Sequence, residues 1–352
     1  ATPRMDSLTQ IALGSAVSVA VMGRRTAVWK AALWGAVAGT LPDLDAFIDH
    51  GDAILNMTRH RAESHALFVL TLAAPVLAWI VSRVHGEAAL FKRWWLALWL
   101  VLVTHPLLDT MTVYGTQLLQ PFSDHPFGVG SIFIIDPAYT VPLIVGVIAA
   151  LRWKNARGLA WNTAGLVLST LYLAWGVGVQ QHVAQLARAS LQQDGVAPEG
   201  LLVTPAPFNT VLWRLVATTP TQYLEGHYSL LDDSKRIVWT VHERGAELIA
   251  QHRNEPNLMR MAAFTHGFYS VSATDGRLFV TDLRMGQEPT YTFRFDLGTD
   301  AARANGGHRP TRSVMSPDLG QALPWLWRRL LGERMAPPGV PPATPRLGAA
   351  PA

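Results

Sequence analysis

Long apolar segments alternate with short polar loops through the first half of the chain. The apolar segments run over residues 7–23, 26–42, 66–84, 94–111, 132–151 and 158–180. A helix that crosses a bilayer needs about 20 largely apolar residues, with ~17 at the lower limit. The third, fifth and sixth segments reach this length, whereas the first two are short and rich in Gly and Ala, which suits close helix packing. The pattern predicts an α-helical multi-pass membrane domain of about six hydrophobic helices over residues 5–181.

Basic residues are distributed unevenly between the loops. Nine of them lie around the connections after the first, third and fifth segments, namely Arg24, Arg25, Lys30, Arg83, Lys92, Arg93, Arg152, Lys154 and Arg157. The loops at the opposite ends, residues 43–65 and 112–131, contain only Arg59 and Arg61. Because Lys and Arg concentrate in cytoplasmic loops, the face with nine basic residues is predicted to be cytoplasmic. The other face then lies outside the cytoplasm.

Most of the unusual polar residues of this half fall on the face predicted to lie outside the cytoplasm. They are Asp6, Asp43, Asp45, His60, His65, His105, Asp109, Asp124 and Asp136. The chain of 352 residues contains no Cys, so disulfides and thiolate ligands are excluded, and a metal would be held by His, Asp or Glu. Three His and at least three Asp at the ends of separate helices favour a divalent metal centre, with zinc as the preferred ion.

Two motifs place single polar residues against apolar runs. In "HPLLD", His105 and Asp109 are four residues apart, which puts both on one helix face, a common geometry for two ligands of one metal. A helix cap with a solvated carboxylate is the alternative. In "IFIIDPAYT", Asp136 lies inside an apolar run, where acids usually face a polar interior, although Pro137 also allows a simple boundary turn.

Two further motifs lie between the second and third segments. "LPDLD" places Asp43 and Asp45 on a turn where paired carboxylates can bind a cation, and a capping turn is the alternative. "RHRAESH" follows, with His60 expected in the loop and His65 in the first turn of the next helix. Arg61, or Arg59 beside it, would there stabilise an anionic group of a ligand.

Beyond about residue 200 the pattern changes to short runs rich in β-branched and aromatic residues. "TVLWRLVATT", "TQYLEGHYSLL", "RIVWTVHE", "RLFVTDLRM" and "TYTFRFDL" are typical of strands, and "DDSK" and "TDGR" of turns. They predict a small antiparallel β domain over residues 200–298, outside the cytoplasm. Residues 299–352 form a low-complexity tail rich in Pro, Ala and Arg that is expected to be disordered. Within it, "LPWLWRRLLGERM" would form an interfacial helix with Trp325 and Trp327 in lipid.

"MDSLTQIALGSAV", "GTLPDLD", "HRAESHAL", "HPLLDTMTVYGTQLLQPFSDHPFG" and "IFIIDPAYT" together resemble the bacterial YdjM-like family, described as inner-membrane metal-dependent hydrolases. The likeness covers about residues 5–180. More distantly, a His followed four residues later by Asp, with an earlier Asp and His, is similar to the helical zinc-dependent phospholipase C group. That resemblance implies as metal ligands Asp43 (or Asp45), His60, His65, His105 and Asp109. Asp45, Arg61 and Asp136 are then the candidate catalytic residues.

Two functions from different classes follow. The first is a membrane-bound metal-dependent hydrolase, in which a metal-activated water attacks a phosphoester or lipid-linked substrate at the outer face of the inner membrane. The second is a non-catalytic membrane protein with a structural metal site and a β domain that binds a periplasmic partner. Membrane lipid is an expected partner in both. Nucleic acid is not, because the net charge of +4 is modest and the basic residues form no stripe.

Overall fold

The computed structural model describes residues 7–304, 308–341 and 344–348, so Asp6 lies outside the described residues. Contacts divide the chain into two compact units. Unit 1 comprises Ala1–Ile48, Arg59–Val177 and Pro207–Asn209. Unit 2 comprises Asp49–Thr58, Gly178–Ala206 and Thr210–Ala352.

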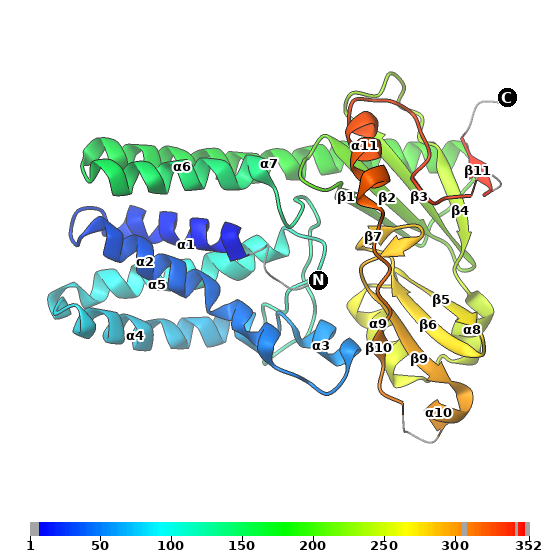
Figure 1. Cartoon of the computed structure of the whole chain (residues 1–352), viewed down its shortest axis with the longest axis horizontal. Coiled ribbons are helices and arrows are strands. Elements are labelled where there is room, and N and C mark those ends of the chain that lie inside the picture. The colour runs from blue at the N-terminus through cyan, green and yellow to red at the C-terminus, as the bar shows by residue number, and fades with distance from the viewer. Residues whose placement is uncertain (1–6, 305–307, 342–343, 349–352) are drawn as a thin grey trace. The chain divides into compact units, whose positions relative to one another are not determined.

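Unit 1 is a bundle of helices that lie side by side (Figure 1). Its long helices are α1 (Ser7–Met22), α2 (Val28–Thr40), α4 (Leu67–Val84), α5 (Phe91–Thr110), α6 (Pro137–Trp153) and the part of α7 (Ala156–Gln193) up to Val177. Two 3₁₀ turns, η1 (Pro42–Phe47) and η2 (Glu63–His65), join α2 to α4, together with the short helix α3 (Ala53–Arg59) of unit 2. Each predicted apolar segment is therefore a helix.

The predicted number of membrane spans is wrong. Among the described residues, two helices are long and apolar enough to cross a membrane by length and composition, α4 and α7. Helices α1 and α6 are apolar but have only 16 and 17 residues, and α2 has 13. Helix α5 has 20 residues, but Lys92, Arg93, His105 and Asp109 lower its hydropathy. The apolar loops that extended the predicted segments do not belong to the helices.

The short helices α1 and α2 are packed backbone against backbone. A Cβ atom added at Gly35 would lie 2.2 Å from the carbonyl oxygen of Gly14, so no side chain fits between the helices there. This confirms the prediction of close packing from their Gly and Ala content. A core of buried Val19, Trp94, Leu98 and Leu70 joins both helices to α4 and α5.

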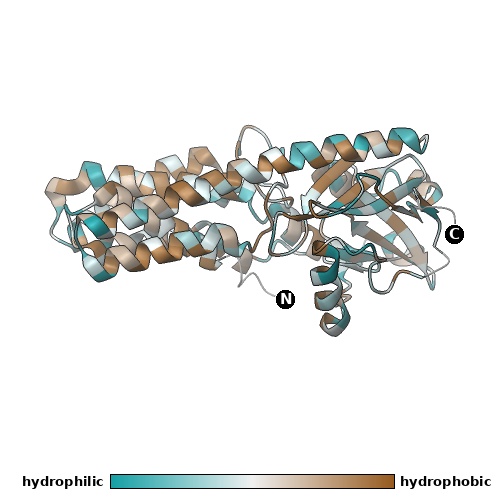
Figure 2. Cartoon of the chain, turned by 90° about the horizontal axis from the view of Figure 1, so that it is seen from above, coloured by the Kyte–Doolittle hydropathy of each residue, from teal (hydrophilic) through white to brown (hydrophobic). Residues whose placement is uncertain are grey.

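The outward surface of the bundle is apolar. Val76, Trp79, Ile148, Leu168 and Leu171 are each more than half exposed, and Figure 2 shows hydrophobic residues along the outer sides of these helices. An extended apolar surface of this kind marks a membrane or protein contact. It therefore fits a bundle that is surrounded by lipid.

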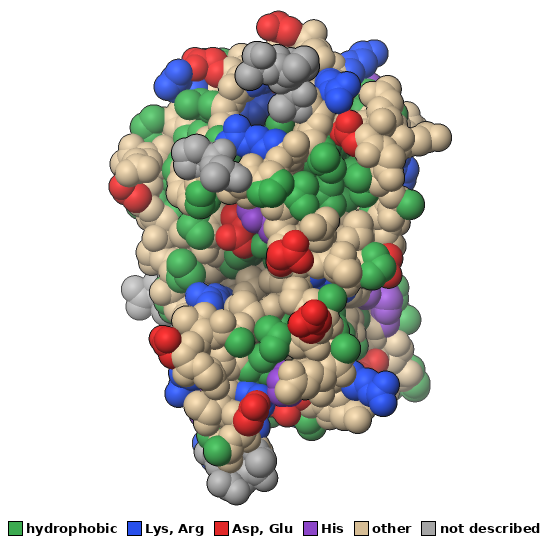
Figure 3. All heavy atoms as spheres, turned by 90° about the vertical axis from the view of Figure 1, so that its right-hand side faces the viewer, with side chains coloured by type: hydrophobic (Ala, Val, Ile, Leu, Met, Phe, Trp, Pro, Cys, Tyr) green, Lys and Arg blue, Asp and Glu red, His purple; other side chains and the backbone are tan. Residues whose placement is uncertain are grey.

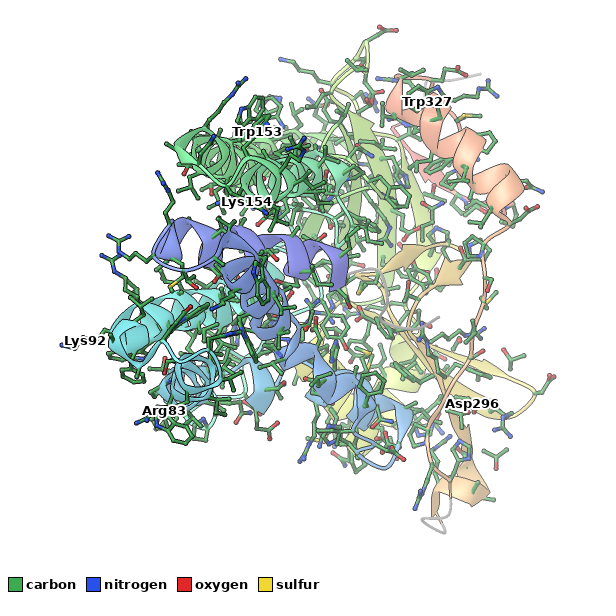
Figure 4. All side chains as sticks on the ribbon, turned by 60° about the vertical axis from the view of Figure 1, so that its left-hand side comes forward. Arg83, Lys92, Trp153, Lys154, Asp296 and Trp327 are labelled. Atoms are coloured by element: carbon green, nitrogen blue, oxygen red, sulfur yellow. The ribbon has the colours of Figure 1, made fainter. Side chains whose placement is uncertain are left out.

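The basic connections meet at one end of the bundle. The loops α1–α2, α4–α5 and α6–α7 lie at that end (Figure 1), and Arg83, Lys92 and Lys154 are found there (Figure 4). The carboxyl ends of α2 and α5 and the start of α4 lie at the opposite end. The alternation of charge along the sequence is thus a separation of charge between the two ends of unit 1.

Unit 2 contains the predicted antiparallel β structure. One sheet has the order β1 (Gly200–Pro205), β2 (Leu212–Thr218), β3 (Gln222–Ser229), β4 (Trp239–Glu243), β11 (Arg346–Leu347). A second has the order β10 (Thr311–Arg312), β9 (Arg294–Thr299), β6 (Arg277–Asp282), β5 (Tyr269–Thr274). A small hairpin joins β7 (Gly286–Gln287) to β8 (Thr290–Tyr291), and the helices α8 (Ala246–Gln251) and α9 (Pro256–Phe264) were not predicted. The end of α7 packs on the first sheet, with Val183 and Leu191 beside Trp213 and Trp239.

The expected disorder of residues 299–352 is wrong for much of that segment. It forms α10 (Asp300–Ala304) and two strands, and the helix predicted within it is present as α11 (Leu319–Leu330). Helix α11 is held because Arg329 pairs with Asp232 and donates to the carbonyl oxygen of His227 at 2.7 Å. Trp325 is buried against the His227 ring, so its predicted insertion into lipid is also wrong. Trp327 is 63% exposed on α11 (Figure 4), and its contact with lipid stays a prediction.

Candidate metal centre

Four residues from three separate elements meet at the end of the bundle opposite the basic loops. Asp43 lies in η1, where Pro42 begins a tighter turn after α2. His65 is the last residue of η2, immediately before α4. His105 and Asp109 lie one above the other in the last turns of α5, as their spacing predicts. One nitrogen or oxygen of each residue lies within 4.8 Å of the corresponding atoms of the other three.

The distances between these atoms are those of a ligand set around a metal. The Nε2 atoms of His65 and His105 are 3.2 Å apart. Asp43 Oδ1 is 3.4 and 3.5 Å from these nitrogens, and Asp109 Oδ2 is 3.3 and 3.4 Å from them. In a tetrahedral site with metal–ligand bonds of about 2.0–2.1 Å, neighbouring ligand atoms are about 3.3–3.4 Å apart. Five of the six edges therefore match tetrahedral zinc coordination.

A hydrogen bond from the other ring nitrogen of His105 fixes the orientation of its imidazole. Its Nδ1 lies 2.7 Å from the carbonyl oxygen of Gly39. A carbonyl oxygen only accepts, so Nδ1 donates and the neutral ring presents the Nε2 lone pair to the other three residues. Gln10, on α1, donates from Nε2 to Asp109 Oδ1 at 3.0 Å, which leaves Asp109 Oδ2 directed to the two histidines.

His65 is oriented through Ser64 and Asp45. The Ser64 hydroxyl donates to Asp45 Oδ2 at 2.6 Å, so its oxygen accepts from His65 Nδ1 at 2.8 Å. Asp45 Oδ2 also accepts the backbone N–H of Arg61 at 3.0 Å, and Oδ1 contacts His60 Nδ1 at 2.7 Å. One carboxylate thus organises the loop that carries His65. Ser64 performs this role rather than capping α4, which begins after Ala66 with no side-chain cap.

Arg61 is buried behind the ligands. Its side chain is 2% exposed, pairs with Asp109 Oδ1 at 3.2 Å and donates to Thr112 Oγ1 at 3.3 Å. Its backbone has a φ of 64°, a left-handed conformation that is rare for a residue with a side chain and is often found at functional sites. The backbone N–H of Gln117 donates to the carbonyl oxygen of Arg61 at 2.9 Å and helps to hold this conformation.

The electrostatics of the group favour a bound cation. Burial raises the pKa of Asp43, but its contacts with His105 and His65 outweigh this and lower it below the usual range. Burial lowers the pKa of His65, but the carboxylates of Asp109, Asp43 and Asp45 outweigh this and raise it to about 10. Asp109 Oδ2 is buried and accepts no hydrogen bond among the described residues. A buried carboxylate oxygen without a hydrogen bond, close to two imidazole nitrogens and a second carboxylate, is a suitable environment for a divalent metal.

The structure brings together four of the five predicted ligands and leaves out His60. The His60 ring contacts Asp45, the Tyr114 ring and the His65 ring, but neither of its nitrogens belongs to the group of four. Asp45 contacts His65 and Arg61 contacts Asp109, so both adjoin the group of four, and their catalytic roles stay a prediction. Asp136 caps α6, because its Oδ1 accepts the Ala138 amide and its Oδ2 accepts the Tyr172 hydroxyl. No described contact of Asp136 supports its predicted catalytic role.

Sequence reasoning missed Gln10, which supports Asp109 from another helix. A Gln in the first turn of an otherwise apolar helix was the available signal in the sequence. The structure buries this side chain, which is 1% exposed. Asp124, part of the predicted polar face, is exposed and outside the group of four. Thr112, by contrast, contacts Arg61 and contributes to the surroundings of the ligands.

Comparison with known proteins identifies the family of the chain. A family model described as YdjM inner membrane protein matches residues 5–183, a range that contains all four grouped residues. The chain is similar to the uncharacterized protein YfhP of Bacillus subtilis (strain 168), with 24% identity over 244 residues, 66% of this chain and 72% of that protein. No solved structure matches the chain. The chain belongs to the YdjM inner membrane protein family.

Proposed function

We propose that this chain is a membrane-bound, metal-dependent hydrolase that binds a divalent metal, with zinc preferred, at Asp43, His65, His105 and Asp109. The observation that carries the proposal is the near-tetrahedral spacing of the four ligand atoms, at 3.2–3.5 Å along five edges. Provided that one coordination position beyond these four ligands is open to water, such a metal would activate that water and polarise a phosphoryl oxygen. Phosphoester or lipid-linked molecules are the proposed substrates.

The residues of the chain would orient the ligands and control access. Gly39 and Asp45 fix the two imidazole rings, and Arg61 holds Asp109. The side chain of Asp43 is 16% exposed, whereas those of His65, His105 and Asp109 are at most 1% exposed. Asp43 therefore marks the side from which solvent and substrate reach the site.

The proposed location is the outer face of the inner membrane. The family supports an inner-membrane location, and the basic end of unit 1 would face the cytoplasm by the positive-inside rule. Because the chain has no Cys, single-cysteine variants test this directly. In intact spheroplasts, a membrane-impermeant maleimide is expected to label a cysteine at the exposed position Asp124 and not one at the exposed position Lys92. Equal labelling of both positions would contradict the proposed topology.

Activity can be tested on the purified full-length protein in detergent. After chelation and reloading with Zn²⁺, the wild-type chain is expected to hydrolyse bis(p-nitrophenyl) phosphate or a member of a phospholipid panel. The His105→Ala variant should be at least about 100-fold slower, because loss of a ligand disrupts the metal site. Equal rates in both proteins would identify a contaminating enzyme, and a loaded wild type without turnover on the panel would contradict the hydrolase.

A structural metal site is the second candidate function. Four protein ligands fill tetrahedral coordination, as they do in structural zinc sites, and they join α2, the start of α4 and α5. In that case chelation would lower the melting temperature of the wild type, and no member of the substrate panel would be hydrolysed. Measuring both quantities on one preparation separates the two functions.

A further inference from the structure

A second site lies in unit 2, formed by residues that the metal centre does not use. An open cavity of about 730 Å³ is lined by β3, β4 and the segment after α11 that contains Arg334 and Pro337. Small-molecule sites typically measure about 300–1,000 Å³. Unit 2 by itself therefore provides enough space for an organic ligand.

The sheet presents its polar face to this cavity. On β3, Leu224 packs toward α7, while the alternate residues Glu225 and His227 line the cavity. Thr240 and His242 of β4 line it too, and Thr240 is paired with Glu225 across the strands. The cavity is thus bordered by hydrogen-bonding groups on the sheet side.

Four arginines line the cavity, and its only lining acid among the described residues does not neutralise them. They are Arg236, Arg329, Arg334 and Arg346. The carboxylate of Glu225 is held by Arg214 of β2 and accepts the Tyr291 hydroxyl at 2.6 Å. Arg329 is paired with Asp232, and Arg236 is paired with Asp194 at 3.1 Å.

Arg334 and Arg346 supply positive charge without a protein counterion. Arg334 donates to the carbonyl oxygen of Ser234 at 2.7 Å, and Arg346 is held in β11 opposite Thr240. In the described part of the chain, neither guanidinium forms an ion pair with a carboxylate. Figure 3 shows Lys and Arg side chains gathered on the upper part of this face of unit 2.

Two histidines complete the lining. His242 Nε2 is buried and has no hydrogen-bond partner among the described residues, while its ring stacks on Tyr223 at 5.1 Å. Burial, with the charges of Arg214 and Arg329, lowers the pKa of His227 to about 3, so this ring is uncharged. Two guanidinium groups without a carboxylate partner and a buried imidazole nitrogen without a hydrogen bond line the same cavity, and we expect them to bind the oxygens of an anion.

We propose that this cavity binds a phosphate monoester. Such a group carries about −1.5 to −2 charges at pH 7, which matches the two unpaired guanidinium groups better than a single carboxylate does. The ligand is either a soluble phosphate or the head group of a lipid such as phosphatidate. The site is independent of the metal centre and of the proposed hydrolysis.

Calorimetric titration of the full-length protein in detergent tests the proposal. The probes are inorganic phosphate, dihexanoyl phosphatidate as a lipid monoester, and dihexanoyl phosphatidylcholine as a diester control. At least one monoester is expected to bind, and the Arg334→Ala/Arg346→Ala variant should bind it at least about tenfold more weakly. The matched control is Arg253→Ala/Arg260→Ala, two exposed arginines of unit 2 outside the cavity, and should bind like the wild type.

The outcomes separate the two ligand sources and the two sites. Tighter binding of phosphatidate than of phosphate identifies a lipid, and the reverse identifies a soluble ligand. If the double variant misfolds, His242→Phe keeps the stacked ring, removes the nitrogen and is expected to weaken binding several-fold. Equal binding in all variants, or no preference for monoesters over the diester, would overturn the proposal. Metal content measured on the same samples should be unchanged, so failure here does not bear on the metal centre.

Discussion

Replacing His105 by alanine is expected to reduce bound divalent metal from about one ion per chain to below about 0.1. His105 contributes one of four ligand atoms, and its removal leaves Asp43 and Asp109 with a single imidazole between them. Asp109→Asn should have the same effect, because an amide is a weaker ligand than a carboxylate. Elemental analysis of detergent-purified protein, after incubation with Zn²⁺ and dialysis, measures the result.

Two histidine controls make this experiment specific. His182→Ala removes an exposed ring outside the four-residue group and should retain the metal content of the wild type. His60→Ala removes a ring that contacts Asp45 and the His65 ring but supplies no atom to the group of four, so it is also expected to retain most of the metal. Metal loss in His60→Ala as severe as in His105→Ala would show that His60 is a ligand after all. Full metal content in both ligand variants would refute the site.

The second large effect is expected from one added methyl group between α1 and α2. In Gly35→Ala, the new Cβ would lie 2.2 Å from the Gly14 carbonyl oxygen, a backbone atom that moves only if the helices separate. Overpacking in a close-packed core costs about 1–3 kcal/mol, and separation would also weaken the packing of Val19 and Trp94. The variant is expected to lose roughly that free energy of unfolding, measured by denaturation of the protein in mixed micelles.

Gly178→Ala is the matched control for this substitution. Gly178 lies in α7, and a Cβ added there has no neighbouring atom within 4 Å. Since alanine favours the helix by about 0.8–1.0 kcal/mol relative to glycine, this variant should be as stable as the wild type or slightly more stable. If Gly35→Ala and Gly178→Ala have the same stability, the close approach of α1 and α2 is not what holds the bundle.

The types of residue in the candidate metal site were predictable from the sequence, but which individual residues belong to it was less so. The spacing of His105 and Asp109 fixes a shared helix face, and the alternation of basic loops indicates which segment ends meet. Neither pattern shows how a loop folds between two helices. The left-handed backbone of Arg61 and the hydrogen bonds of Asp45 turn His65 toward the group and His60 away from it.

Local composition was also a poor guide to the structure of residues 299–352 and to the number of membrane spans. Low complexity suggested disorder for residues 299–352, yet the Arg329–Asp232 pair and the burial of Trp325 hold α11 against unit 2. Those stabilising partners are about a hundred residues away in sequence, so local composition does not reveal them. Likewise, apolar content predicted six spans, but loop residues that lie outside the helices lengthened several segments.

The sequence by itself determined the helical membrane half, the antiparallel β half and the ligand types, because these follow from periodicity, composition and the absence of Cys. The tertiary structure decided which polar residues form the group of four, since only packing brings Asp43, His65 and His105 together from separate elements. It also decided that Asp45 and Arg61 orient ligands and that Asp136 caps a helix. Hydrogen-bond direction and burial fix these roles, and both depend on neighbours that are distant along the chain.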